Sequence, residues 1–315
     1  MDRCTIFGRL ILRLVAIYEK IEWLNFRWMK MKAYQRFLTQ NFIPFDPLEL
    51  ARETEKIVTR SGREGLERKY VGIYSAPVYR GIATGYAGGC CLRCIYCWAN
   101  WSRDFPEMLG EFYSPKEVAH RLFNAAEEGI TSPGWERFKH LKVEKLRLSG
   151  CEPTIGKEHL LSVLEYVKDS KYPLFILETN GMLFGADRNY VKQLKEFKEK
   201  LYVRVSFKAA VPEGFTQRTG AAGGYYELPF KALEYLLEEG IYARAAAMTD
   251  PGVMPRDERK ILIEKLNRID PKEIYSSTLE EEQMDRYDTT LQRLKAFTDL
   301  EFAKKLEKRI EEESK

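Results

Sequence analysis

Cysteine is absent from the second half of this 315-residue chain, and the last of its six cysteines is Cys151. Four of them crowd into the eight residues from Cys90 to Cys97. A disulfide framework spreads its cysteine pairs along the chain, so this distribution excludes one. It predicts metal ligation instead, in a reducing, cytoplasmic setting.

The sequence also lacks a long uninterrupted apolar run. Residues 5–18 are apolar, but the stretch is short and contains Arg9 and Arg13, so no integral membrane span is expected. No small-residue cleavage site closes this stretch as in a signal peptide. Three interpretations remain open: an amphipathic helix that packs on the body, a membrane-surface helix, or a translated leader before a start at Met29 or Met31.

Neither sign of charge dominates, because 51 Lys and Arg stand against 47 Asp and Glu, for a net charge of +4. A solvated basic surface explains this mild excess, and no DNA partner is expected. The three histidines, His120, His140 and His159, stand in helical or polar stretches that favour surface or packing roles. A hydrophobic content of 44% can fill the core of one large domain or two small ones.

Strand and helix patterns alternate between residues 80 and 280, which predicts a parallel sheet covered by helices. The expected strands are 81–87, 145–148, 174–178, 202–207, 242–248 and 273–276, and the expected helices are 114–128, 157–168, 188–198, 228–239 and 257–267. About six such units suit a partial, open (βα)6 TIM-like barrel of the α/β class better than a closed eight-fold one. A flat doubly wound sheet is the alternative.

Three regions are expected: a helical N-terminal extension over 1–75, a core over 76–280, and a C-terminal region over 281–315 with one long amphipathic helix or two. Ligands gather at the carboxyl ends of parallel strands in such folds. The informative residues follow the predicted strands there. They are the cysteine loop at 88–98, the runs 149–153 and 178–181, and Lys208.

The cysteine loop has the spacing Cys-x3-Cys-x2-Cys at Cys90, Cys94 and Cys97. Three thiolates in one loop can hold three irons of a four-iron cluster, which leaves the fourth iron open to bind a reactant. A structural zinc site needs four protein ligands, and Cys151 could supply the fourth. A simple electron-transfer cluster also needs a fourth ligand. Cys91 leaves a second register open, since Cys91, Cys94 and Cys97 form a Cys-x2-Cys-x2-Cys series.

The first spacing, with Tyr96 just before the last cysteine, resembles the radical S-adenosylmethionine (radical SAM) superfamily. The run from Ser149 to Pro153 resembles the Gly-Gly-Glu-Pro motif of that superfamily, and residues 178–181 resemble its Thr-Asn-Gly turn. The resemblance covers roughly residues 80–280. It implies a [4Fe–4S] cluster whose fourth iron takes the amino and carboxylate groups of S-adenosylmethionine.

The resemblance also implies roles for single residues. Cys90, Cys94 and Cys97 would ligate the cluster. The expected S-adenosylmethionine contacts are Tyr96 near the adenine, Gly150, Cys151, Glu152 and Pro153 near the amino group, Glu178, Asn180 and Ser206 near the ribose or methionine, and Lys208 at the carboxylate. Cys151 departs from the motif, since it replaces a glycine, and its side chain narrows the approach of the backbone to the cofactor. Auxiliary clusters need further cysteines, so the resemblance implies one cluster only.

The implied activity is reductive cleavage of S-adenosylmethionine, with one electron from a flavodoxin, a ferredoxin or an equivalent donor. A 5′-deoxyadenosyl radical would then take a hydrogen atom from the substrate. The pair Phe207-Lys208 resembles glycyl-radical activating enzymes, which act on another protein, whereas Cys97-Trp98 resembles the enzymes that build the wyosine base of tRNA. A sensor that binds cluster and cofactor without cleaving it is the alternative of another class.

Two segments keep two interpretations each. Residues 98–104 either line a substrate mouth or pack the cysteine loop. The run from Phe215 to Gly224, which ends in glycines, is either a mobile substrate loop or an ordinary surface connection.

Overall fold

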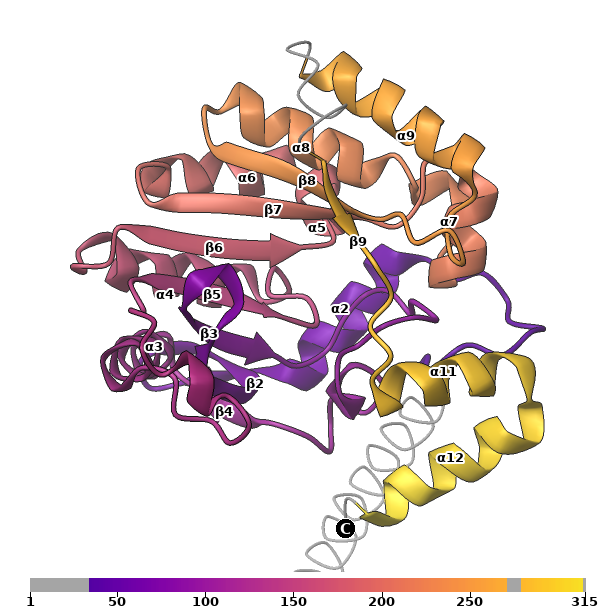
Figure 1. The fold of residues 1–315 in the computed structure, drawn as a ribbon, viewed down its shortest axis with the longest axis horizontal. Coiled ribbons are helices and arrows are strands. Elements are labelled where there is room, and N and C mark those ends of the chain that lie inside the picture. Colours follow the sequence, from indigo (N-terminus) through magenta and orange to yellow (C-terminus); the bar gives the residue numbers. More distant parts are fainter. Residues whose placement is uncertain (1–33, 271–278, 314–315) are drawn as a thin grey trace, which may run out of the picture. The chain divides into compact units, whose positions relative to one another are not determined.

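A nine-stranded sheet forms the centre of the protein in a computed structural model, which describes residues 34–270 and 279–313 (Figure 1). The parallel strands follow one another in chain order: β3 (Ile82–Ala87), β5 (Lys145–Gly150), β6 (Leu174–Thr179), β7 (Leu201–Phe207), β8 (Tyr242–Met248) and β9 (Glu280–Glu282). Because the winding never reverses, right-handed crossovers place the connecting helices on one face. This order confirms the partial, open barrel and excludes the doubly wound sheet.

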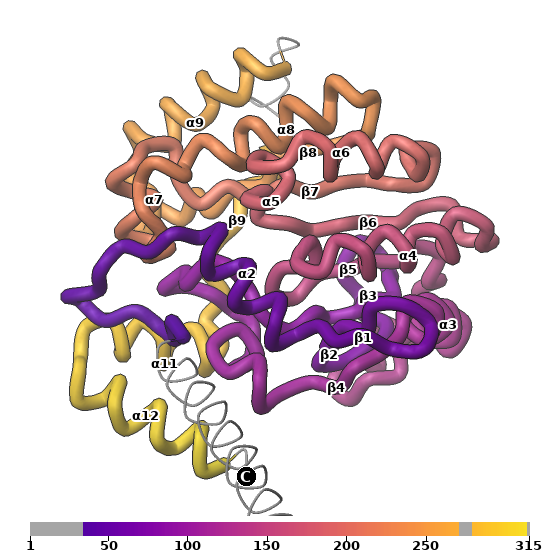
Figure 2. The backbone as a smooth tube through the Cα atoms, turned by 180° about the vertical axis from the view of Figure 1, so that it is seen from behind, coloured from indigo at the N-terminus to yellow at the C-terminus, as the bar shows by residue number. Residues whose placement is uncertain are grey.

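Helices cover the outer face of the sheet, as Figure 2 shows from behind. They are α3 (Pro115–Glu128), α4 (Lys157–Lys168), α6 (Arg188–Leu194), α8 (Leu228–Glu238) and α9 (Arg256–Ile269). Their apolar sides and the outward side chains of the strands form the main hydrophobic core, in which Leu122, Leu148 and Val203 are fully buried. The predicted helices are confirmed, and so are the predicted strands apart from 273–276, which lies outside the described residues.

Local sequence fixes the start of α3. The Ser114 side chain accepts a hydrogen bond from the Glu117 amide, and the Glu117 carboxylate accepts one from the Ser114 amide. Pro115 occupies the first helical position, where its missing N–H costs nothing. This capping box satisfies two amides that the helix itself leaves without partners.

The N-terminal region corrects one expectation. Only α2 (Pro47–Val58) is helical between residues 34 and 76, and it is followed by β1 (Thr59–Gly62) and β2 (Gly65–Ala76). Strand β2 pairs antiparallel with β3 and with β4 (Glu111–Tyr113), so the helical character predicted for residues 59–75 is wrong. Aromatic and β-branched residues from Tyr70 to Tyr74 favour a strand at this edge. The interpretations offered for residues 5–31 lie outside the described residues.

The C-terminal region forms two helices, α11 (Asp288–Thr298) and α12 (Leu300–Glu313). Their buried residues Ala296, Leu306 and Ile310 share a small hydrophobic cluster with Phe37 and Phe105. Within the described ranges, no helix has the length and apolar character needed to cross a membrane. The boundaries predicted near residues 75 and 280 stay predictions of domain organisation.

Candidate functional site

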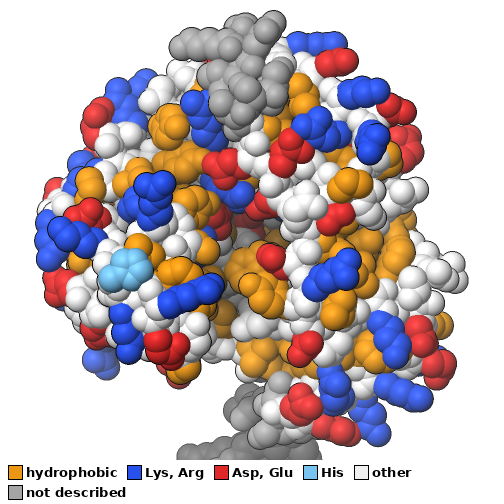
Figure 3. Space-filling model, viewed as in Figure 1, with side chains coloured by type: hydrophobic (Ala, Val, Ile, Leu, Met, Phe, Trp, Pro, Cys, Tyr) orange, Lys and Arg blue, Asp and Glu red, His pale blue; other side chains and the backbone are white. Residues whose placement is uncertain are grey.

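A cavity of about 390 Å³ lies at the carboxyl ends of the parallel strands. The face shown in Figure 3 is hollowed near its centre, with acidic and basic side chains in the hollow. Most of the predicted site residues line the cavity: Cys90, Cys94, Tyr96, Cys97, Gly150, Cys151, Glu178, Asn180, Ser206 and Lys208. Glu152 and Pro153 do not line it, and both are buried behind it.

Two glycines let the cysteine loop leave β3 and turn back against α2. The Gly88 amide donates to the Lys69 carbonyl at 3.1 Å, and the Gly89 amide donates to the Ser102 carbonyl at 3.0 Å. Gly89 has a φ of 77°, and a Cβ there would lie 2.5 Å from Cγ2 of Thr54. Only glycine fits this position, since both the positive φ and the contact exclude a side chain.

The turn after β5 is bound to the start of the cysteine loop. The Cys151 amide donates to the Ala87 carbonyl at 3.1 Å, and the Glu152 amide donates to the Gly89 carbonyl at 3.0 Å. Gly150 has a φ of 97°, and a Cβ there would lie 3.0 Å from the backbone of Ala87. The two motifs recognised in the sequence therefore form one backbone unit.

Of the four thiols in the cysteine loop, three line the cavity and one lies in the protein interior. Cys90, Cys94 and Cys97 line the cavity, whereas Cys91 does not and accepts a hydrogen bond from Nδ2 of Asn180 at 3.3 Å. The hydrogen bond between the two adjacent thiols lowers the pKa of Cys90 and raises that of Cys91. Among the described residues, no group of three His, Cys, Asp or Glu side chains is arranged for a single metal ion.

Glu152 is fully buried, and its carboxylate bonds to the protein itself. Oε1 accepts from the amide and hydroxyl of Thr154, at 3.2 and 2.6 Å, and from the Thr179 hydroxyl at 2.7 Å. Oε2 accepts from the Asn180 amide at 2.7 Å. These bonds join the turn after β5 to the turn after β6. The Glu152 carboxylate thus braces the two turns in this structure, and its expected contact with S-adenosylmethionine stays a prediction.

A charged layer crosses the inner face of the sheet below the cavity. Glu178 accepts from the Tyr79 hydroxyl at 2.7 Å and from Arg147 at 3.2 Å. Although burial opposes it, the guanidiniums of Arg147 and Arg204 lower the pKa of Glu178. Arg204 in turn pairs with carboxylates of β9, through Nη2 to Glu282 at 2.8 Å. Each buried charge is thus paired, as burial requires.

Lys208 and Tyr96 both line the cavity. The Lys208 ammonium donates to the Ser206 hydroxyl at 2.5 Å, and within the described part of the chain it makes no ion pair. The Tyr96 hydroxyl is buried and has no hydrogen-bond partner among the described residues. A buried donor without a partner is costly, so a ligand that bonds to it is expected here.

Sequence reasoning missed part of the lining. Arg204, Met248, Glu282, Gln283 and Asp285 line the cavity although no motif marks them. Alternation along β7 places Arg204 and Ser206 on the same face, and this pattern could have indicated Arg204. The residues from β9 onward follow the part of the chain outside the described ranges, and the sequence held no signal for them.

Residues 98–104 and 215–224, for which two interpretations each were open, have different outcomes. Trp98 lines the cavity with 42% of its surface exposed, whereas Trp101 packs its ring against Phe37 at 6.4 Å between centroids. Residues 212–219 form helix α7 (Pro212–Thr219), so a mobile loop starting at Phe215 is wrong. Carbonyls at the end of α7 accept from amides of the cysteine loop, which makes this segment a support for the loop.

These residues fit an iron–sulfur cluster with S-adenosylmethionine. Three thiols of one loop line one cavity, which suits a cluster held at three corners. The Lys208 ammonium offers a polar contact to a second group in the same space, and the Tyr96 hydroxyl is a buried donor without a partner among the described residues. The donor set and the orphan hydroxyl therefore agree with the cofactors that the resemblance implies.

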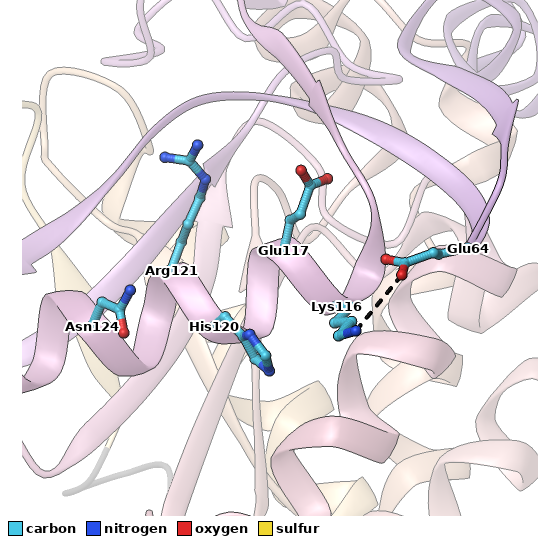
Figure 4. Close-up of a pocket in the computed structure, with 6 residues that line it drawn as sticks. All are labelled: Glu64, Lys116, Glu117, His120, Arg121 and Asn124. Atoms are coloured by element: carbon cyan, nitrogen blue, oxygen red, sulfur yellow. Dashed lines mark ion pairs between the residues drawn. The ribbon is translucent and has the colours of Figure 1, made fainter.

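A second hollow lies on the outer surface beside α3 and is lined by Glu64, Lys116, Glu117, His120, Arg121 and Asn124 (Figure 4). Its side chains point in different directions, and Lys116 pairs with Glu64 at 3.6 Å. Such a surface hollow holds no converging set of functional groups. The cavity at the cysteine loop is therefore the candidate site.

Comparison with known proteins gives one family and several distant structures. The family model described as the radical SAM superfamily matches residues 86–266. No curated protein matches the chain. Streptococcus suis SuiB bound to precursor peptide SuiA is 16% identical over 70% of this chain and 43% of that protein, with a TM-score of 0.47.

Two further structures share similarly low identity. A radical SAM methyltransferase from Sphaerobacter thermophilus is 12% identical over 71% of either chain, with a TM-score of 0.45. TYW1 with a lysine-pyruvate adduct bound is 15% identical over 73% of this chain and 79% of that one, with a TM-score of 0.43. The chain spans about half the length of SuiB and of another similar structure, native anSMEcpe with bound AdoMet and Cp18Cys peptide, covering 43% of the first and 50% of the second.

Proposed function

Because this chain belongs to the radical SAM superfamily, whose members use a [4Fe–4S] cluster and S-adenosylmethionine, we propose that it is an enzyme of that chemistry with one cluster. The observation that carries the proposal is the convergence of the Cys90, Cys94 and Cys97 thiols on one cavity. When bound, the two cofactors supply one-electron cleavage of the sulfonium and hydrogen-atom abstraction from a substrate C–H bond.

The residues of the chain bind and orient these groups. Cys90, Cys94 and Cys97 hold the cluster. The Cys91 thiol lies in the interior, where it accepts a hydrogen bond from Asn180. Lys208 takes the cofactor carboxylate, because its ammonium is a cation at the cavity wall without an ion pair in the described residues. The hydroxyl of Ser206, at the end of β7, accepts a hydrogen bond from this ammonium.

The remaining cofactor contacts come from the cysteine loop and from the turns after β5 and β6. Gly150 and Cys151 face the amino group, with their backbone held by the bond from Cys151 to Ala87. Glu178 and Asn180 offer polar atoms to the ribose or the methionine, and the Tyr96 hydroxyl offers a donor near the adenine. Glu152 and Pro153, which lie behind the cavity, act by positioning these turns.

Cofactor cleavage is the direct test of an enzyme. Anaerobic reconstitution with iron and sulfide, followed by dithionite and S-adenosylmethionine, should yield four irons per chain and 5′-deoxyadenosine, measured by liquid chromatography. A C94A variant is the matched control and should yield neither. A wild-type protein that binds S-adenosylmethionine but leaves it intact is a sensor. A protein that takes up one zinc ion and no cluster contradicts the proposal.

We infer further that the substrate is a segment of a protein, as for activating enzymes. The exposed ring of Trp98 and the carboxylate of Asp285 both line the cavity, whereas the Glu282 carboxylate there is paired with Arg204. Asp285 is exposed and makes no ion pair in the described part of the chain. The Asp285 carboxylate repels the phosphates of RNA, whereas an aromatic ring and a carboxylate suit a peptide chain. Wyosine-type modification of tRNA is the second candidate.

Retention on immobilised tRNA separates the two substrates. A protein-modifying enzyme should pass through the tRNA column at 150 mM salt, and a D285K variant should be retained more strongly than the wild type. Salt-dependent retention of the wild-type protein would favour tRNA instead.

Radical SAM enzymes need an electron donor, and we propose a flavodoxin or a ferredoxin for this one, in a cytoplasmic setting.

A further inference from the structure

Three buried arginines hold the backbone of the cysteine loop, one at each proposed cluster ligand. Each donates from Nη1 to a cysteine carbonyl oxygen: Arg93 to Cys90 at 2.8 Å, Arg103 to Cys94 at 2.6 Å and Arg293 to Cys97 at 2.7 Å. All three side chains are at most 1% exposed. Arginine presents several donors in a rigid fork, which suits carbonyl oxygens that point in fixed directions.

Asp104 joins two of these arginines. Its Oδ1 lies 2.5 Å from Nη2 of Arg103, and its Oδ2 lies 2.6 Å from Nη2 of Arg293. Burial alone would raise the pKa of Asp104, but the two guanidiniums lower it to about 2. Two cations therefore share one anion, and this trio carries a net positive charge in a buried place next to the thiols.

Arg293 comes from helix α11, outside residues 86–266 that match the family model. It also donates to the carbonyls of Ala99 at 2.6 Å and Asn100 at 2.9 Å. The Thr289 hydroxyl of the same helix donates to the Trp98 carbonyl at 3.1 Å. The C-terminal region thus fixes the second half of the cysteine loop, a role that no family motif assigns.

We propose that Arg293 is a positioning residue which, with Arg103 and Asp104, fixes the cysteine loop and raises the reduction potential of the cluster bound there. The proposal rests on the cluster site of the proposed function. Three thiolates around a [4Fe–4S] core make an anionic group, and each added electron makes it more negative. A buried net positive charge beside the ligands stabilises the reduced form, and so raises the potential.

The sign of the charge change is the test. Wild type, R293Q, R293K and D104N are reconstituted anaerobically, and the midpoint potential of each cluster is measured by electron paramagnetic resonance during redox titration. R293Q removes a positive charge and should lower the midpoint potential, whereas D104N removes a negative charge and should raise it. R293K keeps the charge and should stay closer to the wild-type potential than R293Q. R309Q, at an exposed position of α12, is the control and should leave the potential unchanged.

Opposite shifts for R293Q and D104N support the proposal, because loosening of the loop alone has no reason to follow the sign of the charge. Equal potentials in all variants, or shifts in one direction for both, overturn it and leave the proposed function standing. If R293Q does not fold, as judged by circular dichroism, D104N decides: an upward shift supports the proposal and none overturns it. A wild-type protein that takes up no cluster overturns the proposed function and this inference together.

Discussion

The carboxylate of Glu152 accepts a hydrogen bond from the backbone amide of Asn180 at 2.7 Å, so the turns after two neighbouring strands are joined behind the cavity. Both turns carry residues that line the cavity, Cys151 on one and Asn180 on the other. The distance between the two walls of the site therefore depends on one buried carboxylate. This relationship makes Glu152 a determinant of stability as well as of cofactor geometry.

Replacing Glu152 with glutamine should destabilise the protein before any cofactor is added. A Gln side chain placed like the carboxylate brings an NH₂ group against either the Asn180 amide or the Thr154 amide, and two donors then face each other. The expected loss in the free energy of unfolding is about 1–3 kcal/mol, measured by urea unfolding of the cofactor-free chain. The exposed Glu158 is the control, and E158Q should stay within about 0.5 kcal/mol of wild type. An unchanged urea midpoint for E152Q would rule out the bracing role.

His159 should make stability depend on pH. Burial lowers its pKa from 6.5 to about 3, and its ring nitrogens contact the Leu66 carbonyl at 2.7 Å and the Tyr70 hydroxyl at 3.1 Å. Below pH 6.5 the unfolded chain takes up a proton that the folded chain does not. The stabilising contribution is therefore complete above pH 6.5 and decreases as the pH falls towards 3, by about 1.4 kcal/mol per pH unit.

Urea unfolding between pH 7.5 and 5 measures this dependence. An H159Q variant should lose most of the slope between pH 6.5 and 5, even though its stability at pH 7.5 is lower than that of wild type. The exposed His120 serves as the control, and H120Q should keep the slope. Parallel pH profiles for H159Q and wild type would show that the buried ring is not the source.

The two registers of the cysteine loop predict opposite outcomes for two adjacent alanine variants. C90A should lose the [4Fe–4S] spectrum and most of the iron, because Cys90 lines the cavity. C91A should keep both, because the Cys91 thiol lies in the interior under Nδ2 of Asn180. Iron content and absorption after anaerobic reconstitution measure the difference. Iron retained in C90A and lost in C91A would assign the cluster to the other register.

Local signals predicted much of the fold. The Ser114–Glu117 capping box marks the start of α3, and alternation of strands and helices gives a parallel sheet whose order follows the chain. Strand β2 was missed because its alternation is interrupted by charged residues and by a register shift between Tyr70 and Gly72. The residues from Tyr70 to Tyr74 favour a strand, but the pairing with β3 that completes it is not revealed by a local pattern.

The candidate site was predictable where residues close in sequence carry the chemistry. The spacing of Cys90, Cys94 and Cys97 needs no tertiary information. The direction of the Glu152 side chain does need it, because its partner Asn180 comes from the next strand. The contact of Arg293 with Cys97 joins residues 196 positions apart, and one sequence contains no signal for such a pair.

Lys208 provides the sharpest test of the cofactor contacts. Its ammonium reaches the cavity near Cys94 and donates a hydrogen bond to the Ser206 hydroxyl at the end of β7. Removing the charge in K208M should weaken the binding of S-adenosylmethionine by roughly 10–100-fold, the loss expected for one charge-assisted hydrogen bond. Equilibrium dialysis of the reconstituted protein measures the dissociation constant.

The iron content separates a cofactor contact from a general defect, since K208M should keep a full cluster. K208R retains the charge with a different shape and should bind S-adenosylmethionine better than K208M does. The exposed Lys231 on α8 gives a matched control, and K231M should bind like wild type. If K208M binds S-adenosylmethionine as tightly as K231M, the carboxylate contact belongs to another cation of the cavity. The guanidiniums in the described lining are those of Arg103 and Arg204, and both already pair with carboxylates.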